Sequence, residues 1–375
     1  MKQCTKCVMP ETAESLDFSE PVCSVCKQSE VKRDIDWDEA RNRLDTITAE
    51  AKLLRRDYDC IIPFSGGKDS TFTLWYAVRE LGLRCLVVRF DHGFLRQTVR
   101  ENSSRAFRRL GVDSLHFTPN WKIVRRLMLE SLRRRGDFCW HCHTGVFAYP
   151  MQVAIKWNVP LVIWGEGDNE YASWNTTAHN QERFDRVCSL GINAEDMAGM
   201  VDCDERELSC FRFPEQTKDV HSIFLGDFVQ WNPREQTDRI RRELGWQGDE
   251  VEGVPPQYDY DKIECAMQGA RDYIKYLKRG FGRTAHLTSI DIRNGLMTRE
   301  EAIKLCEEYD GKRPASLDHL LSILELSEPE FLSIVADHVV YPHVMEPGPR
   351  ANRTPEDIAD MERTIDDWAA QMSAD

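Results

Sequence analysis

The sequence predicts an α/β protein in which a parallel sheet lies between an N-terminal metal-binding module and a C-terminal helical region. Three observations lead to this prediction. Between residues 57 and 246, short apolar runs alternate with amphipathic helical patterns, as they do in parallel sheets with crossover helices. Two Cys-x-x-Cys pairs lie within the first 30 residues. Residues 255–340 have helical patterns without strand-like runs.

Five strands and five helices are expected in the alternating region. The strands are expected at 59–64, 84–90, 114–118, 161–164 and 222–225, and the helices at 69–81, 96–110, 121–135, 143–156 and 234–244. A helix over 36–56, capped by Asp36 or Asp38, should precede them. The C-terminal region should hold helices at 261–277 and 302–309, the second opened by a capping box from Thr298 to Glu301. A turn at 289–295 and two helices capped by Ser316 and Ser327 are also expected.

Length and composition indicate a multidomain protein whose main partner is not a long nucleic acid. The 375 residues divide into a metal-binding module (1–36), a sheet domain (37–250, with an insertion or lid at 170–220), a helical domain (251–345) and a polar tail (346–375). The net charge is −14, from 49 basic and 63 acidic residues, which disfavours a nucleic-acid partner. No secretory or membrane-spanning pattern is present, so a cytoplasmic location is expected.

The segment Ser65-Gly66-Gly67-Lys68-Asp69-Ser70 lies between the first expected strand and the first crossover helix. This junction directs backbone N–H groups and the positive end of a helix dipole toward a bound anion. The two glycines permit close approach of a phosphate. Ser65 and Ser70 supply hydroxyl groups, and Lys68 supplies a positive charge. A glycine-rich turn that binds nothing is the plain alternative.

The segment is not a Walker A loop, because Ile62 occupies the place of its first glycine and Asp69 follows Lys68. It resembles instead the loop of the PP-loop ATP pyrophosphatases. That resemblance implies cleavage of ATP between its α- and β-phosphates, with the pyrophosphate held by residues 65–70. Lys68 and Asp69 are then the candidate catalytic residues, with Asp69 as the partner of Mg²⁺.

Two further strand ends carry polar residues that belong at the same edge of the sheet. Asp91 follows the second strand and matches the position at which PP-loop enzymes contact the ribose or adenine, although such an Asp is often a turn residue. Gly165 follows the fourth strand and would admit the nucleotide. Glu166 and Asp168 follow it, as candidates for holding Mg²⁺ or steering an amine, or as plain loop residues.

Cys4, Cys7, Cys23 and Cys26 form two Cys-x-x-Cys pairs separated by fifteen residues. This spacing is typical of a structural zinc site with four thiolates. The segment is too short and polar to fold alone, so zinc would supply the missing stability. Two redox dithiols are the alternative.

A third pair, Cys139 and Cys142, opens the helix expected at 143–156. Four interpretations stay open. The thiols could bind a metal with His141 or His143, or an iron–sulfur cluster completed by Cys203 or Cys210. They could also be a redox pair with lowered pKa, or plain packing residues.

A basic cluster follows the first C-terminal helix. Arg279 and Arg283, with Arg293 further on, are candidates for contacting anionic groups of a substrate. A solvated helix end is the plain alternative.

Taken together, these motifs resemble the N-acetyl sugar amidotransferases of bacterial surface-polysaccharide synthesis. The resemblance rests on Cys4–Thr12, Cys23-x-x-Cys26, the loop at 65–70, Phe138–His143 and the strings within 283–311, and it covers most of residues 1–340. It implies that the amide oxygen of a sugar N-acetyl group attacks the α-phosphorus of ATP. Ammonia then displaces AMP from the O-adenylyl imidate and leaves an acetamidino group.

The same resemblance implies a nucleotide-activated N-acetyl sugar as substrate, for O-antigen or other surface glycans. No glutaminase motif is present, so a separate glutaminase subunit is expected to supply ammonia, with a cyclase-like channel protein in some systems. Two alternatives remain. One is a PP-loop tRNA thiolase that uses Cys139 and Cys142, and the other is an inactive nucleotide-binding adaptor.

Overall fold

The computed structural model describes residues 1–13, 16, 18, 21–31, 35–165, 201, 203–214 and 220–345. Most of the insertion expected at 170–220 and all of the tail at 346–375 lie outside the described residues. Glu166 and Asp168 lie outside them as well.

The sheet has five parallel strands in the order β3-β2-β1-β4-β5. Their bounds are β1 Cys60–Pro63, β2 Cys85–Phe90, β3 Asp113–Phe117, β4 Leu161–Trp164 and β5 His221–Phe224. The central strand β1 pairs with both neighbours, and Ile61 lies opposite Leu86 on one side and Val162 on the other. All five strands were predicted to within one residue, and the predicted α/β fold class is confirmed.

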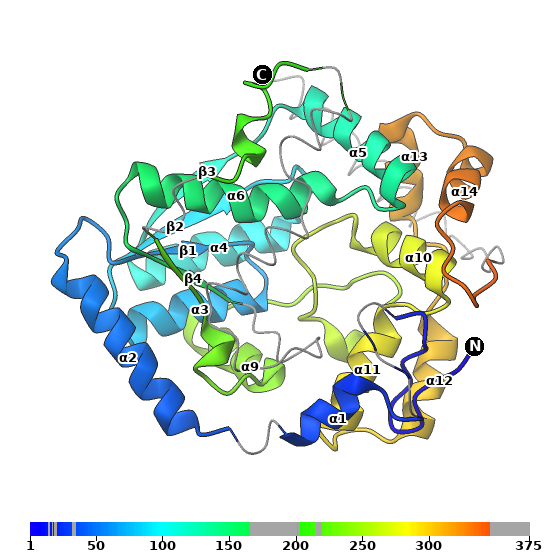
Figure 1. The fold of residues 1–375 in the computed structure, drawn as a ribbon, viewed down its shortest axis with the longest axis horizontal. Coiled ribbons are helices and arrows are strands. Elements are labelled where there is room, and N and C mark those ends of the chain that lie inside the picture. The colour runs from blue at the N-terminus through cyan, green and yellow to red at the C-terminus, as the bar shows by residue number, and fades with distance from the viewer. Residues whose placement is uncertain are drawn as a thin grey trace.

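Helices cover both faces of the sheet (Figure 1). They are α2 Trp37–Leu53, α3 Lys68–Arg79, α4 Gln97–Leu110, α6 Trp140–Lys156 and α9 Pro233–Leu244, while α5 Trp121–Arg135 packs against α6. Alternate strand residues face opposite sides. Ile62 belongs to a hydrophobic cluster with residues of α3, α4 and α9, while Ile61 belongs to one with residues of α6. The predicted cap at Asp36 is present, because its side chain accepts the Asp38 and Glu39 N–H groups.

The C-terminal region consists of α10 Gln268–Arg279, α11 Arg283–Arg293, α12 Arg299–Tyr309, α13 Ser316–Leu324 and α14 Glu328–Ala336. Capping boxes at Thr298 and Ser327 start α12 and α14, as predicted. A short helix α1, Ser24–Val31, belongs to the N-terminal module.

Three local predictions in this region were wrong. The helix expected from 261 begins only at Gln268, since Lys262 has a left-handed φ of 51° that a continuous helix excludes. The turn expected at 289–295 is mostly the end of α11, and only Asn294 and Gly295 turn. Ser316 does not cap α13 but is its first residue, and the carboxylate of Glu252 accepts its N–H group.

The chain after α9 returns to the sheet before it enters the C-terminal helices. Trp246, Val254, Tyr258 and Ile263 are buried in the same hydrophobic cluster as the β1 residue Ile62. Leu95 forms an isolated antiparallel bridge with Cys265. This returning segment, residues 246–265, therefore lies beside the edge of the sheet that carries the loop. None of the described helices is long and apolar enough to cross a membrane.

Candidate functional site

The loop at residues 65–70 connects β1 to α3 and is held by its own hydroxyl groups. Gly67 is the N-cap residue of α3. The Ser70 hydroxyl accepts the Gly66 N–H at 3.0 Å, and the Ser65 hydroxyl accepts the Gly67 N–H at 3.3 Å. The two hydroxyl groups are 3.2 Å apart. The loop is thus ordered at the positive end of α3, where an anion is stabilised.

Gly66 has a φ of 92°, which side chains rarely adopt. A Cβ at this position would lie 2.5 Å from Val99 Cγ1. The indole N–H of Trp246 donates to the Gly66 carbonyl at 3.2 Å. The buried Arg89 donates to the Phe64 carbonyl and to the Ser103 hydroxyl. Burial lowers the pKa of Arg89 to about 10, so it is a positive charge beside the loop at neutral pH.

Lys68 and Asp69 form an ion pair at the first turn of α3. Lys68 Nζ lies 2.8 Å from Asp69 Oδ2 and 3.0 Å from Oδ1. The Lys68 side chain is 2% exposed and that of Asp69 is 13% exposed. The lysine is therefore held in the loop rather than extended into solvent, and a cation and a carboxylate are both present where the predicted chemistry requires them.

Asp91 and Gly165 lie at strand ends, as predicted. Asp91 accepts the Gly93 N–H at 2.8 Å and lies 3.8 Å from Arg100, so it also stabilises its own turn. A Cβ on Gly165 would lie 3.1 Å from the Asp69 carbonyl oxygen. Gly165 is thus packed against the start of α3, and any larger residue would displace the loop.

The four N-terminal cysteines converge as the spacing predicts. Cys4, Cys7, Cys23 and Cys26 are fully buried, and their sulfur atoms all lie within 4.8 Å of one another. The Cys4–Cys26 and Cys7–Cys23 sulfur distances are both 3.9 Å. A tetrahedral ion with sulfur ligands at about 2.3 Å has ligand separations of about 3.8 Å. The set fits one metal ion.

The cysteine module packs on the C-terminal helices α11 and α12 (Figure 1). Arg299 donates to the Cys7 carbonyl at 3.0 Å. Arg279, one of the predicted substrate contacts, donates to the Thr12 carbonyl at 2.5 Å, and the Thr12 hydroxyl donates to the Arg279 carbonyl. In the structure, Arg279 therefore connects the module to α10.

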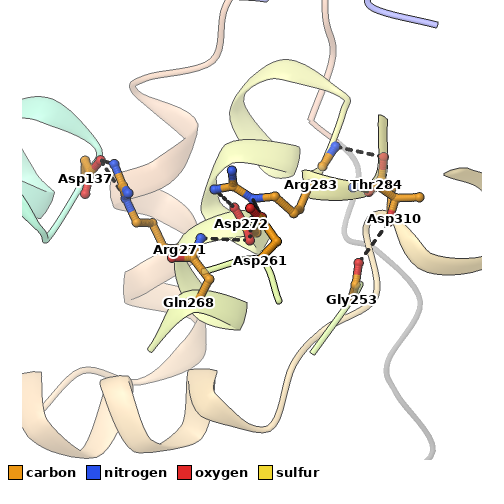
Figure 2. Close-up of polar contacts among 10 residues, drawn as sticks. Asp137, Gly253, Asp261, Gln268, Arg271, Asp272, Arg283, Thr284 and Asp310 are labelled. Carbon is orange, nitrogen blue, oxygen red and sulfur yellow. Dashed lines mark hydrogen bonds and ion pairs between the residues drawn. The ribbon is translucent and has the colours of Figure 1, made fainter. Parts of the chain in front are cut away.

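Arg283 is paired within the C-terminal region, as Figure 2 shows. Its guanidinium group lies 3.1 Å from Asp272 and 3.8 Å from the buried Asp261. Arg293 ends α11. Burial, together with the charges of Lys275, Arg283 and Arg293, lowers the pKa of His286. Arg283 and Arg293 thus both act on His286, while Arg279 contacts the N-terminal module.

Cys139 and Cys142 lie at the start of α6, next to the end of β2. A Cβ on Gly145, one turn further along α6, would lie 2.3 Å from Phe90 Cζ. Burial raises the pKa of both thiols, and the Asp137 carboxylate raises that of Cys139 further. This does not support the predicted alternative of a redox pair with lowered pKa, because desolvation outweighs the helix end.

Cys265, on the returning segment, packs against the same hydrophobic cluster as Cys139. Cys203 and Cys210, the predicted third ligands, contact a different hydrophobic cluster around Leu208 and Phe211.

Three residues of this region were missed by sequence reasoning. Arg89 was hidden inside an apolar strand, and Cys265 and Glu264 stand in no recognisable motif. Glu264 lies at the loop, because a Cβ on Gly67 would be 2.8 Å from its carboxylate. A lone Glu-Cys pair gives no spacing signal, so only the fold could reveal it.

The fold and the site define an α/β protein with an anion-binding glycine loop at a strand–helix junction. Residues 256–366 match the family model described as "LPS biosynthesis protein WbpG-like, C-terminal domain". The match confirms the resemblance to enzymes of surface-polysaccharide synthesis predicted from the sequence. No curated protein sequence matches the chain.

Two solved structures are similar at low identity. NMN synthetase from Francisella tularensis is 11% identical with a TM-score of 0.28, and the match covers 56% of this chain and 97% of that one. The U34-tRNA thiolase NcsA from Methanococcus maripaludis, solved with its [4Fe-4S] cluster, is 12% identical with a TM-score of 0.33, and the match covers 95% of each chain. At these TM-scores neither structure supports an argument about function.

Proposed function

We propose that this protein is an ATP-dependent amidotransferase of lipopolysaccharide synthesis. It converts an N-acetyl group of a nucleotide-activated sugar, as used for O-antigen, into an acetamidino group, with AMP and pyrophosphate as the other products. The observation that carries the proposal is the match of residues 256–366 to an LPS biosynthesis family in a chain that also contains the loop at 65–70.

The loop residues account for activation of the amide. An amide oxygen is a poor leaving group, so it first attacks the α-phosphorus of ATP and expels pyrophosphate. Lys68 and the N–H groups at the start of α3 stabilise the negative charge that develops on the pyrophosphate. Asp69, 13% exposed and beside Lys68, would hold Mg²⁺, which neutralises phosphate charge when bound. Asp91 and Gly165 are the proposed contacts to the nucleoside.

The substrate is an anion, and Lys275, Arg283 and Arg293 are the proposed contacts to its anionic groups. Because the Asp272 and Asp261 carboxylates hold Arg283 in place, Arg283 is suited to orienting the bound substrate rather than to attracting it. Ammonia comes from a separate glutaminase subunit, in some systems through a cyclase-like protein. The four-cysteine module would hold Zn²⁺ as a structural ion, since four thiolates leave no open position.

The second candidate is a PP-loop tRNA thiolase. The observation that favours it is the Cys139 and Cys142 pair together with Cys265, which packs against the same hydrophobic cluster as Cys139, because sulfur transfer requires a cluster or a persulfide. The net charge of −14 disfavours it.

A direct assay separates the two candidates. The protein is incubated with ATP, Mg²⁺ and ammonium, and with either a UDP-linked diacetamido uronic acid or unfractionated tRNA plus sulfide. AMP formation that depends on the sugar, together with an amidine product by mass spectrometry, supports the proposal. AMP formation that depends only on tRNA would overturn it.

A Lys68→Met variant tests the role of the loop in the same assay. We expect sugar-dependent AMP formation to fall on the order of 100-fold or more, because one charge that stabilises the leaving group is removed. Lys156→Met is the matched control, because Lys156 is exposed in the last turn of α6. Thermal unfolding of both variants checks that the fold is kept.

A further inference from the structure

We propose that Arg89 is a buried positive charge whose counter-ion is the phosphate chain bound by the loop at residues 65–70. Arg89 is then a positioning residue, which attracts the phosphates through the intervening protein without touching them. The proposed reaction gives it no role. The inference rests on the proposed function, because it takes the loop to bind the phosphates of a nucleotide.

Arg89 lies directly beside the loop. It is the residue before the last in β2, and it is only 3% exposed. Its Nε donates to the Phe64 carbonyl at 3.4 Å, and its guanidinium group lies over the Phe64 ring, 5.3 Å from the ring centre. A Cβ on Gly66 would lie 3.0 Å from Arg89 Nη2. The charge is therefore adjacent to the glycine whose left-handed conformation shapes the loop.

The hydrogen-bond partners of Arg89 are all neutral. Besides the carbonyl group, Arg89 Nη2 donates to the Ser103 hydroxyl, which donates in turn to the Val99 carbonyl. In the described part of the chain, no carboxylate forms an ion pair with this guanidinium group. Asp91 attracts the charge from two residues further on, but it lies 3.8 Å from Arg100 instead. Arg89 thus has hydrogen bonds without a counter-ion.

A buried charge without a counter-ion lowers the stability of a fold, and an apolar side chain would avoid that cost. Val87, two residues earlier and on the same face of β2, is such a side chain and is fully buried. Burial lowers the pKa of Arg89 only to about 10, so the charge is present at neutral pH. Its place is explained if an anion binds at the adjacent loop, because Coulomb attraction is strong where water is excluded.

The other charges at the loop do not supply this attraction. Lys68 lies 2.8 Å from Asp69, so that pair contributes no net charge. A Cβ on Gly67 would lie 2.8 Å from the Glu264 carboxylate, which adds a negative charge. Without Arg89, the charged side chains around the loop would be net negative and would repel a polyphosphate. Arg89 offsets this repulsion.

Calorimetric titration of the full chain with inorganic pyrophosphate, and separately with adenosine, tests the proposal. Arg89→Met should bind pyrophosphate on the order of 10-fold more weakly, the factor that attraction between unit charges over roughly 10 Å gives at an effective dielectric constant of about 20. Arg89→Lys keeps the charge and should stay within about threefold of the unchanged chain. Adenosine carries no phosphate, so its affinity should be the same in all three proteins.

Arg84→Met is the matched control. Arg84 is exposed just before β2, and its guanidinium group lies 5.3 Å from the centre of the Tyr58 ring, as that of Arg89 does from the Phe64 ring. It lies roughly 16 Å from Arg89 along the strand, where solvent screens its charge, so pyrophosphate affinity should not change. If Arg89→Met does not fold, Arg89→Gln replaces it, since its amide can still donate to the Phe64 carbonyl.

Three results would overturn the proposal. They are pyrophosphate binding by Arg89→Met as tight as that of the unchanged chain, an equal loss in Arg89→Lys and Arg89→Met, and a fall in adenosine affinity by the same factor. The second and third would mean that Arg89 only shapes the loop. An unchanged chain that binds neither pyrophosphate nor ATP would contradict the proposed function as well, so the unchanged chain distinguishes the two failures.

Discussion

Gly66 is the residue on which the shape of the loop depends most. Its φ of 92° disfavours any side chain, and a Cβ there would approach Val99 to 2.5 Å, which leaves no room for one. We expect Gly66→Ala to lower the free energy of unfolding by about 2–4 kcal/mol, the sum of backbone strain and overpacking.

Gly111→Ala separates the cost of backbone strain from the cost of overpacking. Gly111 also has a positive φ, 66°, but nothing lies within 4 Å of its Cβ position. The Gly111→Ala variant should therefore lose only about 1 kcal/mol of unfolding free energy, from backbone strain. Denaturant unfolding of both variants measures the difference, and equal losses would show that the contact with Val99 is unimportant.

His92 gives the protein a predictable response to acid. Burial lowers its pKa from the ordinary value of 6.5 to about 4, against the attraction of Asp91. Between these two pH values the unfolded chain binds a proton that the folded chain does not. Stability should therefore fall as the pH decreases from 6.5 to 4, by up to about 3 kcal/mol from this residue.

Denaturant unfolding between pH 4 and pH 7 measures this contribution. His92→Gln should reduce the slope of stability against pH in that window by about one proton. An unchanged slope would mean that His92 is not the group responsible.

At the scale of elements, metal binding by the cysteine module should stabilise its packing against α11 and α12. Cys23→Ser removes one of four ligands, so the chain should lose its N-terminal zinc and unfold at a lower temperature. Arg299→Ala removes the hydrogen bonds to the Cys7 carbonyl and to the Gln3 side chain but no cysteine ligand. It should keep the zinc and lose about 1–3 kcal/mol of unfolding free energy, because these bonds involve a charged donor. Zinc content and thermal unfolding of both variants check this, and zinc retention by Cys23→Ser would contradict it.

Elements whose signal is local were predictable from the sequence. The strands are apolar runs bounded by turns, and the capping boxes at Thr298 and Ser327 are local hydrogen-bond patterns, so their positions were found. The start of α10 was missed because the left-handed Lys262 interrupts an amphipathic pattern that continues through it. The capping of α13 was missed because Glu252, remote in the sequence, accepts its first N–H groups.

The same distinction applies to the candidate site. The four-cysteine set and the loop at 65–70 are compact motifs, and the structure brings the residues of each together. The hydrogen bonds between Arg279 and Thr12 could not be predicted, because a basic helix end has the same sequence pattern whether it meets an anion or a carbonyl group. Cys265 and Glu264 reach the loop only through the return of the chain to the sheet, which no spacing rule describes.

At the scale of the whole molecule, the chain brings three parts to one edge of the sheet. The loop follows β1, and Cys139 and Cys142 open α6 beside the end of β2. The returning segment adds Glu264 and Cys265, which lie within the residues 256–366 that match the LPS biosynthesis family model. We therefore expect the sheet to activate ATP and the C-terminal helices to select the substrate, acting at a shared edge.

The most direct test of the proposed reaction follows the oxygen atom of the substrate amide. If that oxygen attacks the α-phosphorus and the C–O bond then breaks when ammonia adds, the oxygen must leave in AMP. With a nucleotide sugar carrying ¹⁸O in its N-acetyl carbonyl, mass spectrometry should find one ¹⁸O in the phosphate of AMP and none in the amidine product. AMP that stays unlabelled, and that takes up ¹⁸O from labelled water instead, would contradict the proposed reaction.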